Sequence, residues 1–121
     1  DASQGEGAYV DADITDHDAV PGQVPGRAGI KYWVTTMHDA FADLTGVVED
    51  TVLEGDKIAA RVTWHGTHRG DFVGIPGTGV AVTMQSVQIL KFTDGLASDW
   101  WGTADVFGVL RQVGASVAPP A

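Results

Sequence analysis

The sequence predicts a single α+β domain in which an antiparallel sheet carries helices on one side. A strong helical pattern comes first, a run of turn-linked strands follows it, and a short helix closes the chain, which is the order typical of this class. The chain has 121 residues and no cysteine. Because this length allows a hydrophobic core without disulfides, we expect one domain over residues 1–121, with a flexible tail at 115–121.

The first helix is expected between Pro25 and Leu44. Pro25 and Gly26 mark its start, and apolar residues then recur at steps of three and four, which predicts one apolar stripe. The stripe comprises Ile30, Trp33, Val34, Met37, Phe41 and Leu44. Ahead of this helix, the segment DADITDHD (11–18) is rich in acids, but their spacing does not match a calcium loop. We expect a solvated acidic loop there.

Five strand-like segments follow the helix. They cover 47–54, 58–68, 71–75, 80–92 and 96–102, and turns that contain glycine separate them. A last short helix is expected from Ala104 to Val113, closed by Gly114. The strand 80–92 mixes apolar and polar residues on both faces, which is typical of a strand covered on both sides. We therefore expect helices and a pocket on one face of a strongly curved sheet, and a homodimer formed through the outer face.

The formal net charge of −9 argues against several classes of partner. It repels nucleic-acid phosphates and anionic membranes, and the seven Lys and Arg residues form no cluster that could offset it. No apolar run approaches the roughly 20 residues of a membrane span, and the N-terminal DASQGEG lacks the basic and apolar parts of a signal peptide. We expect a soluble, cytoplasmic protein that binds neither nucleic acid nor membranes.

Metal and hydrolase motifs are not supported. His65 and His68 lie three apart on a strand and therefore face opposite sides, so one metal ion cannot take both. The glycines of GIPGTG (74–79) are not followed by the Lys and helix of a phosphate-binding loop. Ser86 and Ser98 lie outside any G-x-S-x-G context. We expect no metal site and no serine hydrolase chemistry.

The stretch SDWWGTADVFGVLRQVG (98–114) holds the most informative acid, Asp105. One interpretation is structural: Thr103 caps a helix whose first turn contains Asp105, where the helix dipole favours a negative charge. The other interpretation is functional. A carboxyl group walled by aromatic rings binds its proton more tightly and becomes a useful base. The stretch alone leaves both open.

Two histidines and several wide side chains also have two interpretations. His17 could cap backbone groups or reach a pocket, and His68, on the apolar face of its strand, could be a hydrogen-bonded strut or an assisting residue. His38 and His65 are expected at the surface. Large apolar side chains could form the core or line a deep apolar cavity. They are Trp33, Met37, Phe41, Trp64, Trp100 and Trp101.

In order and spacing, the motifs resemble those of the SnoaL-like polyketide cyclase family, within the nuclear-transport-factor-2-like superfamily. The resemblance covers nearly all of residues 9–114, and the stretches GTHRGDFVGIPGTG and D-x-x-G-x-x-R-Q-x-G are its most specific parts. The matching pieces are YVDADITDHD (9–18), GRAGIK (26–31), AFADL (40–44), the segment 47–79, FTDG (92–95) and WGTADVFGVLRQVG (101–114).

The resemblance implies a fold and an activity. The fold is a cone-shaped α+β barrel, whose strongly curved, mixed but mostly antiparallel sheet wraps around helices and a deep pocket, and which dimerises through the outer sheet. The activity is a cofactor-free aldol cyclisation or isomerisation of a lipophilic, carbonyl-bearing substrate. In the family's cyclases an aspartate that matches Asp105 removes a proton from carbon, and a histidine assists at a position that matches Lys91. Family members usually begin with a long amphipathic helix, which we expect to be missing here.

We expect Asp105 to act as general acid and base, with Lys91, His17 or His68 assisting. The expected pocket lining comprises Trp33, Met37, Phe41, Trp64, Gln85, Val87, Ile89 and Trp101. Two alternatives remain open. One is an epoxide-hydrolase-like or hydroxylase-like enzyme with the same pocket, for which Arg61, Asp99 and Asp105 offer a loose counterpart of the known Asp-Arg-Asp array. The other is a non-catalytic protein that binds hydrophobic small molecules.

Overall fold

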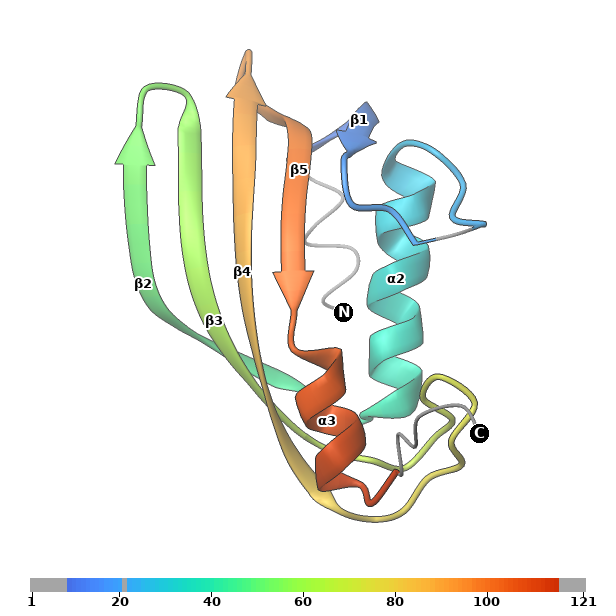
Figure 1. Cartoon of the computed structure of the whole chain (residues 1–121). Coiled ribbons are helices and arrows are strands. Elements are labelled where there is room, and N and C mark those ends of the chain that lie inside the picture. The colour runs from blue at the N-terminus through green and yellow to red at the C-terminus, as the bar shows by residue number, and fades with distance from the viewer. Residues whose placement is uncertain (1–8, 21, 116–121) are drawn as a thin grey trace, which may run out of the picture.

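The computed structural model describes residues 9–20 and 22–115. A five-stranded sheet in the order β1-β5-β4-β3-β2 carries two helices on one side (Figure 1). The elements are β1 (Val10–Asp16), α2 (Arg27–Ala40), β2 (Thr45–Glu54), β3 (Lys57–Thr67), β4 (Ala81–Thr93), β5 (Leu96–Ala104) and α3 (Val106–Gln112). The predicted α+β class is confirmed. Residues 116–121 of the expected tail lie outside the described residues. So do residues 1–8, on which the expectation of a missing N-terminal helix depends.

The sheet is mixed, mostly antiparallel and strongly curved, as predicted. β1 runs parallel to β5, and the other three pairs of neighbouring strands are antiparallel. The long strands β2, β3 and β4 bend toward the helices at their lower ends (Figure 1). The sheet does not close into a complete barrel, because β1 and β2 remain its edge strands.

The prediction of an acidic loop at 11–18 was wrong for most of its length. Residues 10–16 form β1, in which Val10 and Ile14 are buried while the acids between them face outward. Val10 and Ile14 pack with Ile30 of α2 and Ala97 of β5. The aspartates hid the strand, because they are among the residues least favoured in strands.

The helices are shorter than predicted. α2 ends at Ala40, because Phe41 leaves the helical conformation with φ −129° and ψ 83°. The segment 71–75, expected as a strand, contributes only an isolated bridge between Phe72 and Ile75. Neither α2 nor α3, the helices of the part described, has the length and hydrophobicity that crossing a membrane requires.

The main hydrophobic core lies between the helices and the lower half of the sheet. It comprises Met37, Ala40, Phe41, Phe72, Val82, Met84 and Val109, with Trp33, Leu44, Trp64, Val106 and Leu110 packed against it. Along β4, Val82, Met84 and Ser86 are buried, whereas the residues between them are exposed. Because side chains alternate along a strand, β4 has a helix-facing side and an outer side.

Three side chains form hydrogen bonds with backbone groups of a strand, at places where that strand extends past the end of its neighbour. Asp18 accepts the backbone N–H of Gly102 beyond the end of β1 (2.8 Å), and Asp43 accepts that of Thr67 beyond the end of β2 (2.7 Å). Beyond the end of β5, the Gln112 amide accepts from the Thr83 N–H (2.9 Å) and donates to the Thr83 carbonyl (2.8 Å). These bonds satisfy backbone groups that have no strand partner.

Candidate functional site

Asp105 lies at the junction of β5 and α3. Its backbone N–H donates to the Gln85 carbonyl (2.9 Å), which ties the junction to β4. Its carboxylate Oδ1 accepts the backbone N–H of Gly108 (2.9 Å), so Asp105 is itself the N-cap of α3. The prediction that Thr103 caps this helix was wrong, because β5 continues through Ala104 and Thr103 pairs with Val87 inside the sheet.

The two tryptophans that precede Asp105 do not enclose it. They are adjacent in β5 and therefore point to opposite faces of the sheet. Trp100 pairs with Leu90 and packs on the helix-facing side against the cluster of Val10, Ile14, Ile30 and Ala97. Trp101 pairs with Ile89 on the outer side. Asp105 itself is exposed, so the expected aromatic wall around its carboxyl group is not found.

The residues expected to line one pocket lie on two faces. Trp33, Met37, Phe41 and Trp64 belong to the core between sheet and helices. Gln85, Val87, Ile89 and Trp101 share the outer face of the sheet, as the strand registers and the alternation along β4 require. The structure therefore does not bring these eight residues together.

The helix-facing side of the sheet is covered at its lower end and less covered above. Along β4, Val82, Met84 and Ser86 are buried, while Gln88 and Leu90 are only half-buried. The Trp64 indole donates to Ser86 Oγ (2.9 Å), which satisfies both groups. The Gln88 amide, in contrast, makes no hydrogen bond to another described residue. Gln88 is not among the pocket residues expected from the sequence, although a polar side chain on an apolar strand face is a signal that could have indicated it.

His17 forms a cluster with Asp99 and Trp101 on the outer face. The His17 Nε2 lies 2.9 Å from Asp99 Oδ1, and the imidazole stacks on the Trp101 indole with centroids 4.3 Å apart. The Lys57 ammonium lies 5.5 Å from the centre of the Trp101 ring. Sequence reasoning did not pair His17 with Asp99, which is 82 residues away.

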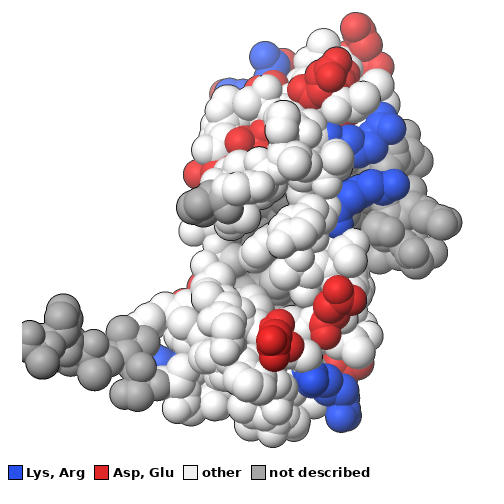
Figure 2. Space-filling model, turned by 90° about the vertical axis from the view of Figure 1, so that its right-hand side faces the viewer, with Lys and Arg blue, Asp and Glu red and all other residues white. Residues whose placement is uncertain are grey.

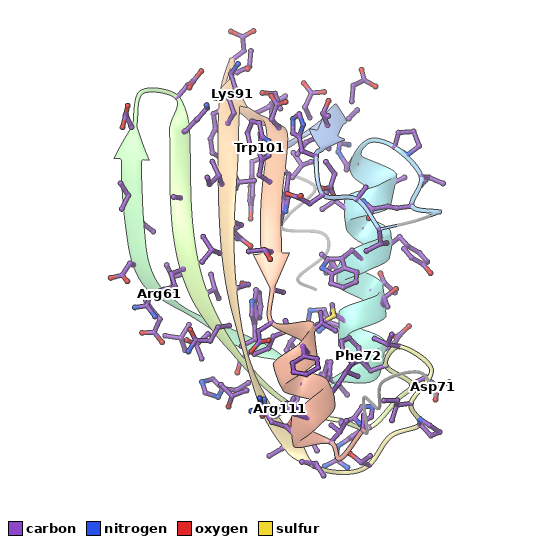
Figure 3. All side chains as sticks on the ribbon, viewed as in Figure 1. Arg61, Asp71, Phe72, Lys91, Trp101 and Arg111 are labelled. Atoms are coloured by element: carbon purple, nitrogen blue, oxygen red, sulfur yellow. The ribbon has the colours of Figure 1, made fainter. Side chains whose placement is uncertain are left out.

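Lys91 and Arg61 are not brought to Asp105. Lys91 pairs with Asp99, and Asp105 is six residues further along the chain, just past the end of β5, which corresponds to about 20 Å of extended chain. Lys91 and Trp101 lie near the upper end of the sheet, well above Arg111 of α3 (Figure 3). Arg61 donates to the Asp50 carboxylate (2.8 Å). The structure thus assembles no Asp-Arg-Asp array from Arg61, Asp99 and Asp105.

His68 holds a loop. Its side chain is fully buried, and its Nδ1 lies 3.0 Å from Thr78 Oγ1 and accepts the Thr78 backbone N–H (3.3 Å). Its ring packs 5.7 Å from that of Phe41. These contacts support the strut interpretation, since they join the end of β3 to the loop before β4.

The His17–Asp99 pair is expected to contribute stability that is lost in acid. The hydrogen bond from His17 is the main cause that lowers the pKa of Asp99 below its ordinary value of 3.8, and partial desolvation opposes it. A carboxylate with a lowered pKa stabilises the fold above its ordinary pKa, and this contribution disappears as the pH falls through the lowered value. Thermal unfolding of the protein and of Asp99→Asn from about pH 6 to pH 3 tests this. The difference between the unfolding midpoints of the wild type and Asp99→Asn should become smaller as the pH falls. A difference that stays constant would contradict the prediction.

Asp105 lines neither of two hollows. A small hollow of about 10 Å³ lies in the lower core, between Phe41, Trp64 and Val109. An open depression of about 300 Å³ lies at the lower end of the outer face, lined by Asp43, His65 and threonines. Among residues 9–20 and 22–115, no three His, Asp or Glu side chains are grouped to hold a metal ion.

The surface seen from the α2 side carries charged side chains of both signs in its upper and lower parts, and few of them lie in the narrow region between (Figure 2).

Comparisons with known proteins agree with this fold. The family model of the SnoaL-like polyketide cyclases matches residues 4–113. The chain is 31% identical over 99 residues to the nogalonic acid methyl ester cyclase of Streptomyces nogalater, a match that covers 72% of this chain and 74% of that protein.

Solved structures of other proteins also have this fold. The structure of TsrD from Streptomyces laurentii superposes with a TM-score of 0.86 at 27% identity and covers 94% of this chain and 84% of that one. AclR from Streptomyces galilaeus, which carries a provisional hydroxylase assignment, has a TM-score of 0.77 at 28% identity, with coverage of 93% and 71%. The chain belongs to the SnoaL-like polyketide cyclase family.

Proposed function

We propose that the protein closes a ring in a lipophilic, carbonyl-bearing polyketide by an intramolecular aldol reaction, with Asp105 as general base and acid. Family membership supports the polyketide substrate class. The similarity to a nogalonic acid methyl ester cyclase supports ring closure as the reaction.

The proposed reaction balances without an oxidant or reductant. Asp105 takes a proton from a carbon next to a carbonyl group, which leaves an enolate. The enolate carbon then attacks a second carbonyl group of the same molecule, a carbon–carbon bond forms, and Asp105 returns its proton to the new alkoxide. The product has the same composition as the substrate, so the reaction requires no redox cofactor.

The position of the Asp105 carboxylate is the observation that carries this proposal. Its Oδ1 is held by the Gly108 N–H, and its Oδ2 makes no hydrogen bond to a described residue. Since the side chain is exposed, Oδ2 is free to receive a proton from a bound substrate. A lipophilic substrate that covers the carboxylate would also exclude water and strengthen the base.

The half-buried upper part of the helix-facing side is the proposed substrate surface. Trp33, Leu90 and Trp100 offer apolar contact there, and all three are half-buried. Gln88 faces the same side and pairs with Gly102, three residues before Asp105, or about 10 Å along the strand. Its amide N–H offers a donor for a carbonyl oxygen of a substrate that lies along this side, a polar contact that would orient the substrate.

The test is a conversion assay with nogalonic acid methyl ester as the probe, followed by chromatography and mass spectrometry. We expect a cyclised product of unchanged mass. A product heavier by one oxygen atom would support the hydroxylase alternative. Tight binding without conversion would support a non-catalytic binding protein and contradict the proposal.

We also propose that two copies of the chain associate through the outer face of the sheet. Val52, Ala59, Ile89 and Trp101 form a continuous row there by register. Val52 is 64% and Ile89 is 37% exposed. An apolar row with an aromatic residue and charged neighbours is typical of the centre of an interface.

The substitution Ile89→Asp should convert the dimer into a monomer, because it places a charge in the apolar row. Size-exclusion chromatography with light scattering measures the mass, with Val24→Asp as a control at an exposed loop position. The control should keep twice the mass of one chain. A wild-type protein that elutes as a monomer at micromolar concentration would refute the proposed dimer.

A further inference from the structure

We infer that Gly108 is a positioning residue for Asp105: its missing side chain leaves the space in which the carboxylate lies. This inference rests on the proposed function of Asp105. It concerns one contact, between the N-cap of α3 and the third residue of that helix.

The space is closely defined. A methyl group built on Gly108 would lie 2.8 Å from the Asp105 Cγ and 3.1 Å from its Oδ1, and it would be closer still to Oδ2. Real side chains do not approach a carboxyl carbon so closely. Any residue with a Cβ at position 108 therefore forces the carboxylate to move.

An ordinary helix cap does not require a glycine at this position. A capping aspartate normally accepts the N–H of the third helical residue whatever its side chain is, and residues such as Glu are common there. Here the cap residue has φ −80° and ψ 68°, whereas the usual cap conformation is extended. The Asp105 carboxylate is thus folded back over Gly108 more closely than capping alone needs.

Glycine also has a cost at this place. It is among the least favourable residues in a helix, and alanine is the most favourable. A structural role alone would favour alanine at position 108, so the glycine is better explained by the position of the carboxylate than by the helix.

The first test uses no substrate. Amide hydrogen exchange of residue 108, measured by NMR, reports whether the Asp105 carboxylate accepts its N–H. In Gly108→Ala this amide should exchange faster than in the wild type. In an Asp105→Ala background the same substitution should leave the exchange rate, relative to that of the unfolded chain, unchanged and raise the midpoint of thermal unfolding, because the three atoms nearest to the methyl group all belong to the Asp105 carboxyl group.

The second test is kinetic, with nogalonic acid methyl ester. Gly108→Ala should lower kcat by about 100-fold, since displacing a reacting group by about 1 Å has such an effect, and should leave KM unchanged. If Gly108 had only a structural role, a folded Gly108→Ala variant would not show a lower kcat together with an unchanged KM.

The outcomes distinguish this inference from the proposed function. If Asp105→Asn retains full activity, the proposed function fails whatever Gly108 does. If Asp105→Asn is inactive while Gly108→Ala keeps the wild-type kcat, the inference fails alone. An exchange rate at residue 108 that is the same in the wild type and in Gly108→Ala would overturn the inference even in the absence of turnover.

Discussion

Asp105→Asn should abolish ring closure and leave the fold intact. The asparagine keeps an oxygen that can accept the Gly108 N–H, but it cannot take up a proton from carbon. General base catalysis contributes about 100- to 10,000-fold to a rate, so kcat should fall by that factor. The free energy of unfolding should change by no more than about 1 kcal/mol, because the cap survives.

The matched control is Asp11→Asn. The Asp11 carboxylate also accepts a nearby backbone N–H, that of Asp13 at 2.7 Å, but it lies on β1, away from α3. This variant should retain full activity. The conversion assay measures the rates of both variants and the wild type, and circular dichroism checks that they are folded. Undiminished turnover in Asp105→Asn would rule out the base role.

Phe41→Ala should be the most destabilising of the substitutions considered. The Phe41 side chain is 1% exposed, and its ring lies 5.1 Å from that of Phe72 and 5.7 Å from that of His68. Removing a buried phenylalanine side chain costs about 3–5 kcal/mol, because apolar contacts are lost and a cavity remains. Urea unfolding measures this change.

Tyr32→Ala is the control for that experiment. Tyr32 lies on the same helix as the core residue Met37 but is 60% exposed. Its replacement should change the free energy of unfolding by less than about 0.5 kcal/mol. A cost below about 1 kcal/mol for Phe41→Ala would mean that the lower core repacks around the missing ring.

The sequence was most informative where periodicity and turns coincide. The glycine-containing turns and the alternation of β3 and β4 placed four of the strands to within a few residues. The apolar stripe located α2, although it continued past the helix end because Phe41 and Leu44 also pack against the core. β1 was missed, and with it the parallel pairing that brings His17 to Asp99.

The site was harder to predict because it depends on strand faces and lengths. Alternation alone requires Trp100 and Trp101 to point in opposite directions, but it does not say which of them faces the helices. β5 runs two residues further than expected, and this extension moves the cap from Thr103 to Asp105. The approach of the carboxylate to Gly108 depends on backbone angles that residue patterns do not specify.

The hydrogen bonds of Asp18, Asp43 and Gln112 at the projecting strand ends have a consequence for solubility. At an uncovered strand end, unpaired N–H and C=O groups can form hydrogen bonds with another chain and so start polymerisation. The N–H groups of Gly102, Thr67 and Thr83 and the C=O group of Thr83 are already occupied. The sheet can therefore be built from strands of unequal length while these four groups are unavailable for fibre growth.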